Sequence, residues 1–319
     1  GKKQVVIDER RTAEVADKVA SAQERLEPFA ASRYVVRYLG AQTLEGGGVL
    51  FGFWTPALDE RSLPSEELFL ELLLPPEGLD PTVEEQRVSF RRLLLSPLRA
   101  GEFTWAVVTE LEPGERSHLG PFYSLVYRDE SGEWRRILDP LAASVPFGAG
   151  APAELYDVEK ALARRADLEY VHRLDTDTEK DPDGVARIKG PVNMLEVHVA
   201  TAGEEGTLRG LTDRYRRIGE KVRSKTPLSP GERSFVGYDA VQLMPVEPTI
   251  LFEGGPSFWE EERRSESEIE VSLRRPNSTN WGYDVITVAS PAPNPTLLGS
   301  GRPDELLDLI ATLHNFPDR

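Results

Sequence analysis

The chain has 319 residues, of which 39% are hydrophobic and 29% charged, and its formal net charge is −16. This length predicts about two domains, and the charge excludes a nucleic-acid partner, because a phosphate backbone requires a basic face. No run of about 18 apolar residues occurs, so no membrane span is expected. With no cysteine and four scattered histidines, the sequence predicts no disulfide, metal site or cofactor. A cysteine-free chain without a signal-type apolar start is most simply cytoplasmic.

Residues 1–39 predict a helical segment. Apolar residues between Ala13 and Leu26 recur at helical spacing among charged ones. A second short pattern at 34–39 ends at Gly40, where a helix can stop.

Residues 40–145 predict an antiparallel β-sandwich domain. Trp54, Phe103 and Trp105 fall on strand-like runs and are expected in its core. An exposed row formed by Trp54, Trp105 and Trp134 would instead indicate a module that binds glucan. Short runs of β-type residues, separated by turn signals at the spacing of a sandwich, lie at 49–54, 68–74, 88–93, 103–109, 123–127 and 134–138.

The sequence predicts a linker over residues 146–190, with a polar helix at 158–168. Over residues 191–319 it predicts the first part of a (β/α)8 TIM barrel. Apolar, β-branched runs at 192–199 and 238–246 are typical of parallel strands buried on both faces. Amphipathic helices are predicted at 207–222 and 303–313. The stretch 247–302, between the second strand and the second helix, shows no regular pattern. This order of elements opens a barrel, but a full barrel takes about 250 residues, so the predicted one is incomplete in this chain. Its open strand edges leave association into an oligomer possible.

Several motifs carry a family resemblance. Gly237-Tyr-Asp-Ala-Val-Gln-Leu-Met-Pro-Val246, followed by Asn280-Trp-Gly-Tyr-Asp-Val285, resembles the second barrel strand and the next segment of glycoside hydrolase family 13, the α-amylase superfamily. Leu195-Glu-Val-His-Val199 resembles its first strand, Gly206-Thr-Leu-Arg-Gly-Leu211 resembles the start of the helix after that strand, and Arg136-Ile-Leu-Asp-Pro-Leu-Ala142 resembles the end of the sandwich in branching-enzyme-like members. With Asn294-Pro and Arg302-Pro-Asp-Glu-Leu-Leu, the combination is most similar to glucosylglycerol hydrolases.

The resemblance implies a glycosidase that cleaves an α-glucosidic bond with retention, most directly in the compatible solute 2-O-glucosylglycerol. Retention requires two carboxyl groups about 5 Å apart. The family places its catalytic groups on the third, fourth, fifth and seventh barrel strands, none of which is predicted here. We therefore assign no catalytic residue to this chain. An amylase or branching-enzyme relative that acts on α-glucans, or a non-catalytic carbohydrate-binding fragment, remains an alternative.

The resemblance also implies part of a sugar site. Tyr283 matches a tyrosine that stacks on the glucosyl ring, and Asn280 lies where relatives carry an Asp that binds sugar hydroxyls. An aromatic face suits the C–H face of a sugar, and an amide both donates and accepts hydrogen bonds. Trp281, Asp284 and Glu247 complete the predicted set, and the expected partner is a small sugar. His198 lies inside an apolar run and is expected to be a core residue.

Overall fold

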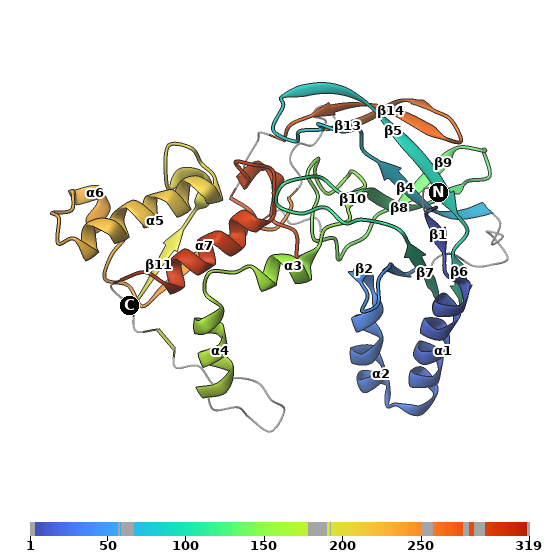
Figure 1. Ribbon diagram of the computed structural model, residues 1–319, viewed down its shortest axis with the longest axis horizontal. Helices are drawn as coiled ribbons and strands as arrows, with labels where there is room; N and C mark the ends of the chain where they lie inside the picture. The colour runs from blue at the N-terminus through green and yellow to red at the C-terminus, as the bar shows by residue number, and fades with distance from the viewer. Residues whose placement is uncertain are drawn as a thin grey trace.

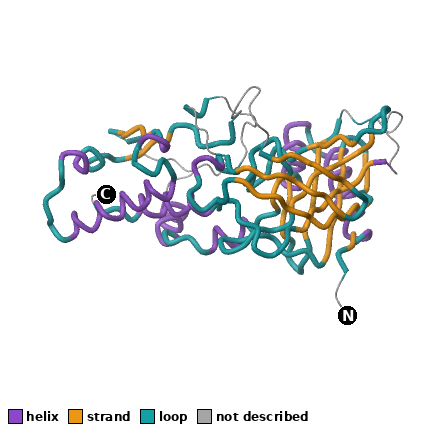
Figure 2. The backbone as a smooth tube through the Cα atoms, turned by 90° about the horizontal axis from the view of Figure 1, so that it is seen from above, coloured by secondary structure: helices purple, strands orange, loops and turns teal. Residues whose placement is uncertain are grey.

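The computed structural model describes residues 4–56, 58, 67–177, 190–191, 193–249, 258–276, 281–283 and 291–317. Strands gather at one end of the long axis, and helices dominate the other (Figures 1 and 2). The antiparallel sheets and the helices of the sequence prediction are confirmed, whereas the barrel start stays a prediction. Within the described ranges, no helix is long and apolar enough to cross a membrane.

The first sheet is antiparallel and has five strands. Its central strand β7 pairs with β3 over the full length of β3, with Phe51 opposite Ala106. A short strand near the N-terminus, which the sequence prediction missed, joins the edge of this sheet beside β7. In spatial order the strands are β1 (Val6–Ile7), β7 (Phe103–Thr109), β3 (Val49–Trp54) and β2 (Gly40–Thr43), and β6 (Leu98–Ala100) also pairs with β7.

The second sheet has seven strands and includes a hairpin from much later in the chain. That hairpin, β13–β14, lies in the stretch for which the sequence predicted no regular structure, and β14 pairs with β5 in register from Glu268–Arg91 to Arg274–Glu85. In spatial order the strands are β10 (Ala153–Glu154), β8 (Phe122–Arg128), β4 (Leu68–Leu74), β5 (Glu85–Leu95), β14 (Glu268–Arg274) and β13 (Trp259–Arg264), and β9 (Trp134–Ile137) pairs with β8.

One hydrophobic core joins the two sheets. Alternate side chains of β3 and β7 meet those of β4 and β8, because successive residues of a strand point to opposite faces. Phe51 and Tyr123 pack edge to face across this core at 5.1 Å between ring centroids. The buried members include Val49, Phe53, Leu68, Leu70, Leu72, Ala106, Val108 and Leu125.

The predicted N-terminal helical segment consists of helices α1 (Glu9–Arg25) and α2 (Pro28–Val35), followed by a 3-10 turn over Val36–Tyr38. Asp8 caps α1 by accepting a hydrogen bond from the Arg11 backbone N–H. Pro28 begins α2, where its missing N–H costs nothing. The inner face of α1 packs on Trp105 and Val107, so the helices cover the outer face of the five-stranded sheet.

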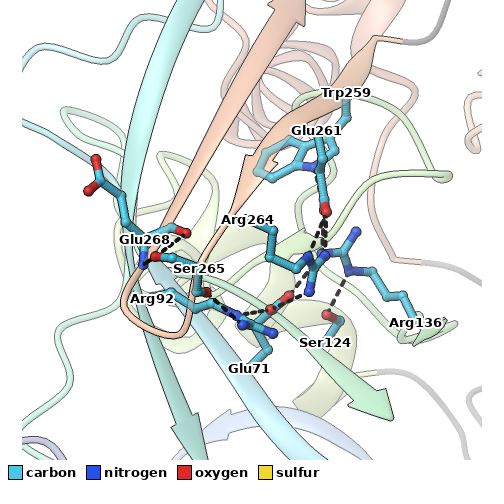
Figure 3. Close-up of polar contacts among 9 residues, drawn as sticks. All are labelled: Glu71, Arg92, Ser124, Arg136, Trp259, Glu261, Arg264, Ser265 and Glu268. Carbon is cyan, nitrogen blue, oxygen red and sulfur yellow. Dashed lines mark hydrogen bonds and ion pairs between the residues drawn. The ribbon is translucent and has the colours of Figure 1, made fainter. Parts of the chain in front are cut away.

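A buried ion cluster attaches the hairpin to the second sheet. Glu71 on β4 is completely buried. Its carboxylate accepts hydrogen bonds from Arg92 on β5 at 2.6 Å, Arg136 on β9 at 2.8 Å and Arg264 on β13 at 3.0 Å. Glu261 of the hairpin pairs with Arg136 at 2.6 Å (Figure 3). Four strands therefore converge on one carboxylate.

The remaining elements form a smaller α/β unit. Its strands β11 (Met194–Val197) and β12 (Ala240–Leu243) are parallel, as predicted, with Leu195 opposite Val241. Their inner side chains pack on α5 and α7, with Tyr215 fully buried between Phe235 and Phe316. The helices are α3 (Val158–Ala163), α4 (Leu168–Asp177), α5 (Leu208–Arg223), α6 (Pro230–Arg233) and α7 (Asp304–His314), with 3-10 turns at Val199–Thr201 and Pro295–Leu297.

Two sets of polar contacts, each centred on a buried carboxylate, hold α7 in place. Before its N-terminus, Arg302 binds both oxygens of Glu154 on β10 at 2.9 and 2.8 Å and donates to the Glu115 and His118 carbonyls. At its C-terminus, His314 Nδ1 lies 2.6 Å from Asp167, whose carboxylate also accepts a bidentate pair from Arg165. The Arg302–Glu154 pair thus ties the smaller unit to the second sheet through buried charges, whereas the Asp167 contacts hold α7 within the smaller unit.

Replacing Glu71 by Gln should lower the free energy of unfolding by about 3–5 kcal/mol, because three guanidinium groups would lose their buried counter-charge. Urea unfolding measures this change. Glu260→Gln on the exposed side of β13 is the matched control, and it should stay within about 0.5 kcal/mol of the wild type. Equal stabilities for the two variants would contradict the anchoring role of Glu71.

Replacing Asp167 by Asn should destabilise the protein at neutral pH by about 1.5–3 kcal/mol through the lost charged hydrogen bonds. Burial by itself raises the pKa of Asp167, but hydrogen bonds from Arg165 and His314 outweigh it, so the pKa in the folded state lies below its usual value. This contribution is present above the usual Asp pKa and is lost as pH falls through the folded-state pKa.

The stability gap between wild type and Asp167→Asn should therefore narrow as urea unfolding is repeated from about pH 5 down to about pH 2. Asp17→Asn, at an exposed position of α1, controls for a general loss of negative charge. A gap that widens on acidification would contradict this account.

Candidate functional site

The parallel pair β11–β12 has two different faces. Leu195 and Val197 on β11 face the core formed with α5 and α7, together with Val241 and Leu243 on β12. On the other face, Glu196 is exposed and lies in register with the exposed Gln242. The prediction that these strands are buried on both faces is therefore wrong for the described chain. The apolar runs did predict the parallel pairing, because one face still packs on helices.

Trp281 and Tyr283 lie at the carboxyl ends of these two strands. The Trp281 ring stacks on the His198 ring at 5.5 Å between centroids and 14° between planes. His198 directly follows β11. Both aromatic side chains are largely exposed, Trp281 by 69% and Tyr283 by 67%. The arrangement presents flat apolar faces at the edge where parallel strands end.

Gly282 fits this short segment against the end of β12. Its φ of 85° lies in the left-handed region, which non-glycine residues adopt at a cost. A Cβ added there would overlap the carbonyl oxygen of Pro245, two residues beyond β12, and lie 3.1 Å from the Pro245 Cβ. A glycine between two aromatic residues thus lets the backbone approach the strand end closely.

The segment after β12 is held by hydrogen bonds on both sides. Met244 N–H donates to the Val197 carbonyl at 2.9 Å, which extends the contact between the two strands beyond their ends. Asn294, buried, donates its backbone N–H to the Val246 carbonyl at 2.6 Å and its side-chain amide to Thr249 at 3.1 Å. Glu247 lies between these points and is half-buried. Its backbone is therefore fixed beside the strand ends.

His198 is not the fully buried core residue that the sequence predicted. It is half-buried, and its Nδ1 lies 3.0 Å from the Thr201 hydroxyl. The position of His198 one residue beyond a strand end could have indicated that it lies beside the candidate site and not in the core. Ligands of parallel sheets bind outside the carboxyl ends of the strands.

The predicted sugar-site residues are only partly within the described chain. Trp281, Tyr283 and Glu247 lie near the ends of β11 and β12, while Asn280 and Asp284 lie outside the described residues. That any of the five contacts a sugar stays a prediction. Among the residues placed by the structure, no group of three or more His, Cys, Asp or Glu side chains could hold a metal ion.

The three sandwich tryptophans do not form an exposed row. Trp105 is buried, as expected, and stacks on Phe103. Trp134 lies under the guanidinium groups of Arg92 and Arg128. Trp54 was expected in the core but is 60% exposed, with its Nε1 donating to Glu102 at 2.9 Å. One isolated ring is a weak basis for a glucan-binding module.

The family described as hypothetical glycoside hydrolase 5 matches residues 13–319 of this sequence. The chain belongs to this glycoside hydrolase family. A solved structure from Salmonella typhimurium, described as a "Putative alpha Amylase", is similar at 16% identity and a TM-score of 0.44 over 87% of this chain. The chain covers 31% of that protein's length. No curated protein matches the sequence.

Membership of a glycoside hydrolase family confirms the coarse part of the sequence-based resemblance. The assignment to glycoside hydrolase family 13 and to glucosylglycerol hydrolases goes further than this match and belongs to the proposal below.

Replacing Gly282 by Ala should lift Trp281 away from His198, because the new methyl group meets the Pro245 carbonyl. In proton NMR spectra, the His198 ring protons should then lose the ring-current shift that the stacked indole causes. Gly237→Ala is the matched control, since Gly237 has a φ of 84° and no atom within 4 Å of an added Cβ. The Gly237→Ala variant bears the same backbone strain as Gly282→Ala, about 1–2 kcal/mol. It should leave the His198 signals unchanged.

Proposed function

We propose that this glycoside hydrolase family member acts on an α-glucosidic bond with retention, with 2-O-glucosylglycerol as the substrate. In this proposal, the chain supplies the sugar-contacting aromatic residues Trp281 and Tyr283. The observation that carries it is the exposure of both rings, on either side of Gly282, at the carboxyl ends of the parallel strands β11 and β12. Membership of a glycoside hydrolase family supports the class of reaction.

The chemistry of the exposed rings suits a sugar. An aromatic face is apolar and accepts the C–H face of a pyranose, while nearby polar groups take the hydroxyls. Tyr283 is assigned to the glucosyl ring, and Trp281 is held flat by its stack on His198. Asn280, Asp284 and Glu247 are assigned to sugar hydroxyls.

The two catalytic carboxyl groups that retention requires, about 5 Å apart, are not assigned to residues of this chain. The proposal includes no cofactor and no metal ion. A small uncharged substrate and a cysteine-free chain fit a cytoplasmic setting.

The substrate is the finer part of the proposal. It rests on the motifs around Asn280-Trp-Gly-Tyr283, Asn294-Pro and Arg302-Pro-Asp-Glu-Leu-Leu, which resemble glucosylglycerol hydrolases. The alternative substrates are α-glucans, as for an amylase or branching-enzyme relative. A carbohydrate-binding role without catalysis is a further alternative.

Calorimetric titration of the 319-residue chain with glucosylglycerol tests the proposal. We expect binding without release of glucose, and Tyr283→Ala or Trp281→Ala should weaken binding at least about tenfold, or about 1.4 kcal/mol. Trp54→Ala, which removes a comparably exposed indole elsewhere, should change the affinity less than about twofold.

Titration with a maltooligosaccharide separates the substrates, since tighter binding of the oligosaccharide would favour the α-glucan alternative. Release of glucose by the chain alone would contradict our decision to assign no catalytic carboxyl group to it. An unchanged affinity for glucosylglycerol in both Tyr283→Ala and Trp281→Ala would contradict the proposed sugar contact.

A further inference from the structure

A cavity of about 430 Å³ lies between α1, the 3-10 turn after α2 and the β2–β3 hairpin. This volume lies within the range of small-molecule sites, roughly 300–1,000 Å³. The elements that line the cavity, α1 and the β2–β3 hairpin, lie at the opposite end of the long axis from β11 (Figure 1). The cavity is therefore separate from the sugar contact proposed above.

The floor of the cavity is apolar and buried. Val15, Leu50 and Val107 line it and are buried in the core between α1 and the five-stranded sheet. Tyr38 adds an aromatic ring to the lining, tilted against Tyr34 at 5.4 Å between centroids. A floor of this kind suits the apolar face of a ring rather than a fully hydrated ion.

Polar groups of fixed orientation line the same cavity. Gln42 donates from its side-chain nitrogen to the Arg37 and Leu39 carbonyls at 2.8 and 2.7 Å, so its side-chain oxygen remains as an acceptor. The Tyr38 hydroxyl shares a 3.0 Å hydrogen bond with Tyr34. That hydrogen bond and burial raise the pKa of Tyr38, which keeps its hydroxyl protonated. Such groups match the hydroxyls of a sugar.

Three cations line the cavity, and none of them has a carboxylate partner among the described residues. Arg11 donates to the Gly47 carbonyl at 2.7 Å. Lys18 and Arg37 are exposed at the rim. Of the two carboxylates in the lining, Glu14 pairs with Arg10, which lies outside the cavity, so Glu45 alone is left to oppose the three cations.

This local excess of positive charge occurs in a protein of net charge −16. By contrast, the arginines at Glu71 and Glu154 form ion pairs with those carboxylates. Cations that line a cavity and are left unpaired favour an anionic group, which accepts strong charge-assisted hydrogen bonds from them.

We propose that this cavity binds a small phosphorylated sugar, with its phosphate held by Lys18 and Arg37 and its ring laid on Tyr38 and the apolar floor. The phosphate takes the unpaired cations, and the sugar ring takes the floor and the Gln42 acceptor. A neutral sugar would leave the cations unused, and free phosphate would leave the floor unused.

Calorimetric titration of the full chain with glucose 6-phosphate, glucose and inorganic phosphate tests the site. Glucose 6-phosphate should bind at least about tenfold more tightly than either of the others. The double variant Lys18→Gln/Arg37→Gln should lose at least about tenfold in affinity for it. Arg33→Gln, an exposed arginine of α2 that lies over Phe29, should stay within about twofold.

Lys18→Glu alone should abolish binding, and its thermal unfolding curve shows whether the chain still folds. Glucose 6-phosphate binding that is no tighter than that of phosphate or glucose would overturn the proposal. So would an affinity that the double variant leaves unchanged, or an absence of binding by all three probes. Since Trp281 and Tyr283 are untouched in these variants, such a failure is distinct from failure of the proposed function.

Discussion

The buried carboxylate of Glu71 joins four strands of the second sheet. It gathers arginines from β5, β9 and β13 at a point removed from water. Burying an unpaired carboxylate or three unpaired guanidinium groups costs free energy, because the charges lose their hydration. The cluster is therefore stable only when all partners are present. The hairpin β13–β14 must therefore sit in the second sheet, although it follows β12 in the sequence (Figure 3).

This placement of the hairpin has a consequence for the strand ends of the smaller unit. The chain leaves β12, joins the distant sheet through β13 and β14, and then supplies Trp281 to Tyr283 at the ends of β11 and β12. Arg275 continues the attachment, with its backbone N–H donating to the Glu84 carbonyl at 2.9 Å. The aromatic residues are thus supplied by a segment that begins at the sheet and ends at Asn294, which is bonded to Val246. The buried Arg302–Glu154 pair fixes the same two bodies from the α7 side.

The distribution of charge separates two kinds of surface on one acidic protein. At the ends of β11 and β12, the presented groups are aromatic and neutral or acidic, which suits an uncharged sugar. Between α1 and the β2–β3 hairpin, the lining cations have no carboxylate partner among the residues that the structure describes, which suits the proposed phosphorylated ligand. Family membership supports glycosidase chemistry in general, whereas the phosphorylated ligand is proposed from the shape and charge of the cavity.

The sequence by itself determined the local elements. Alternation and turn signals placed β3, β4 and β7 at their observed bounds, and helical spacing located α1, α5 and α7, because these patterns depend on neighbours a few residues apart. It also identified the aromatic pair around Gly282 and the parallel pairing of β11 with β12. Only the tertiary structure decided that 259–274 joins the distant sheet, because the residues with which it pairs lie far away in the sequence, as Glu71 does for Arg264. The same holds for the exposure of Trp54 and the stacking of His198 under Trp281, because these depend on which faces meet and not on local periodicity.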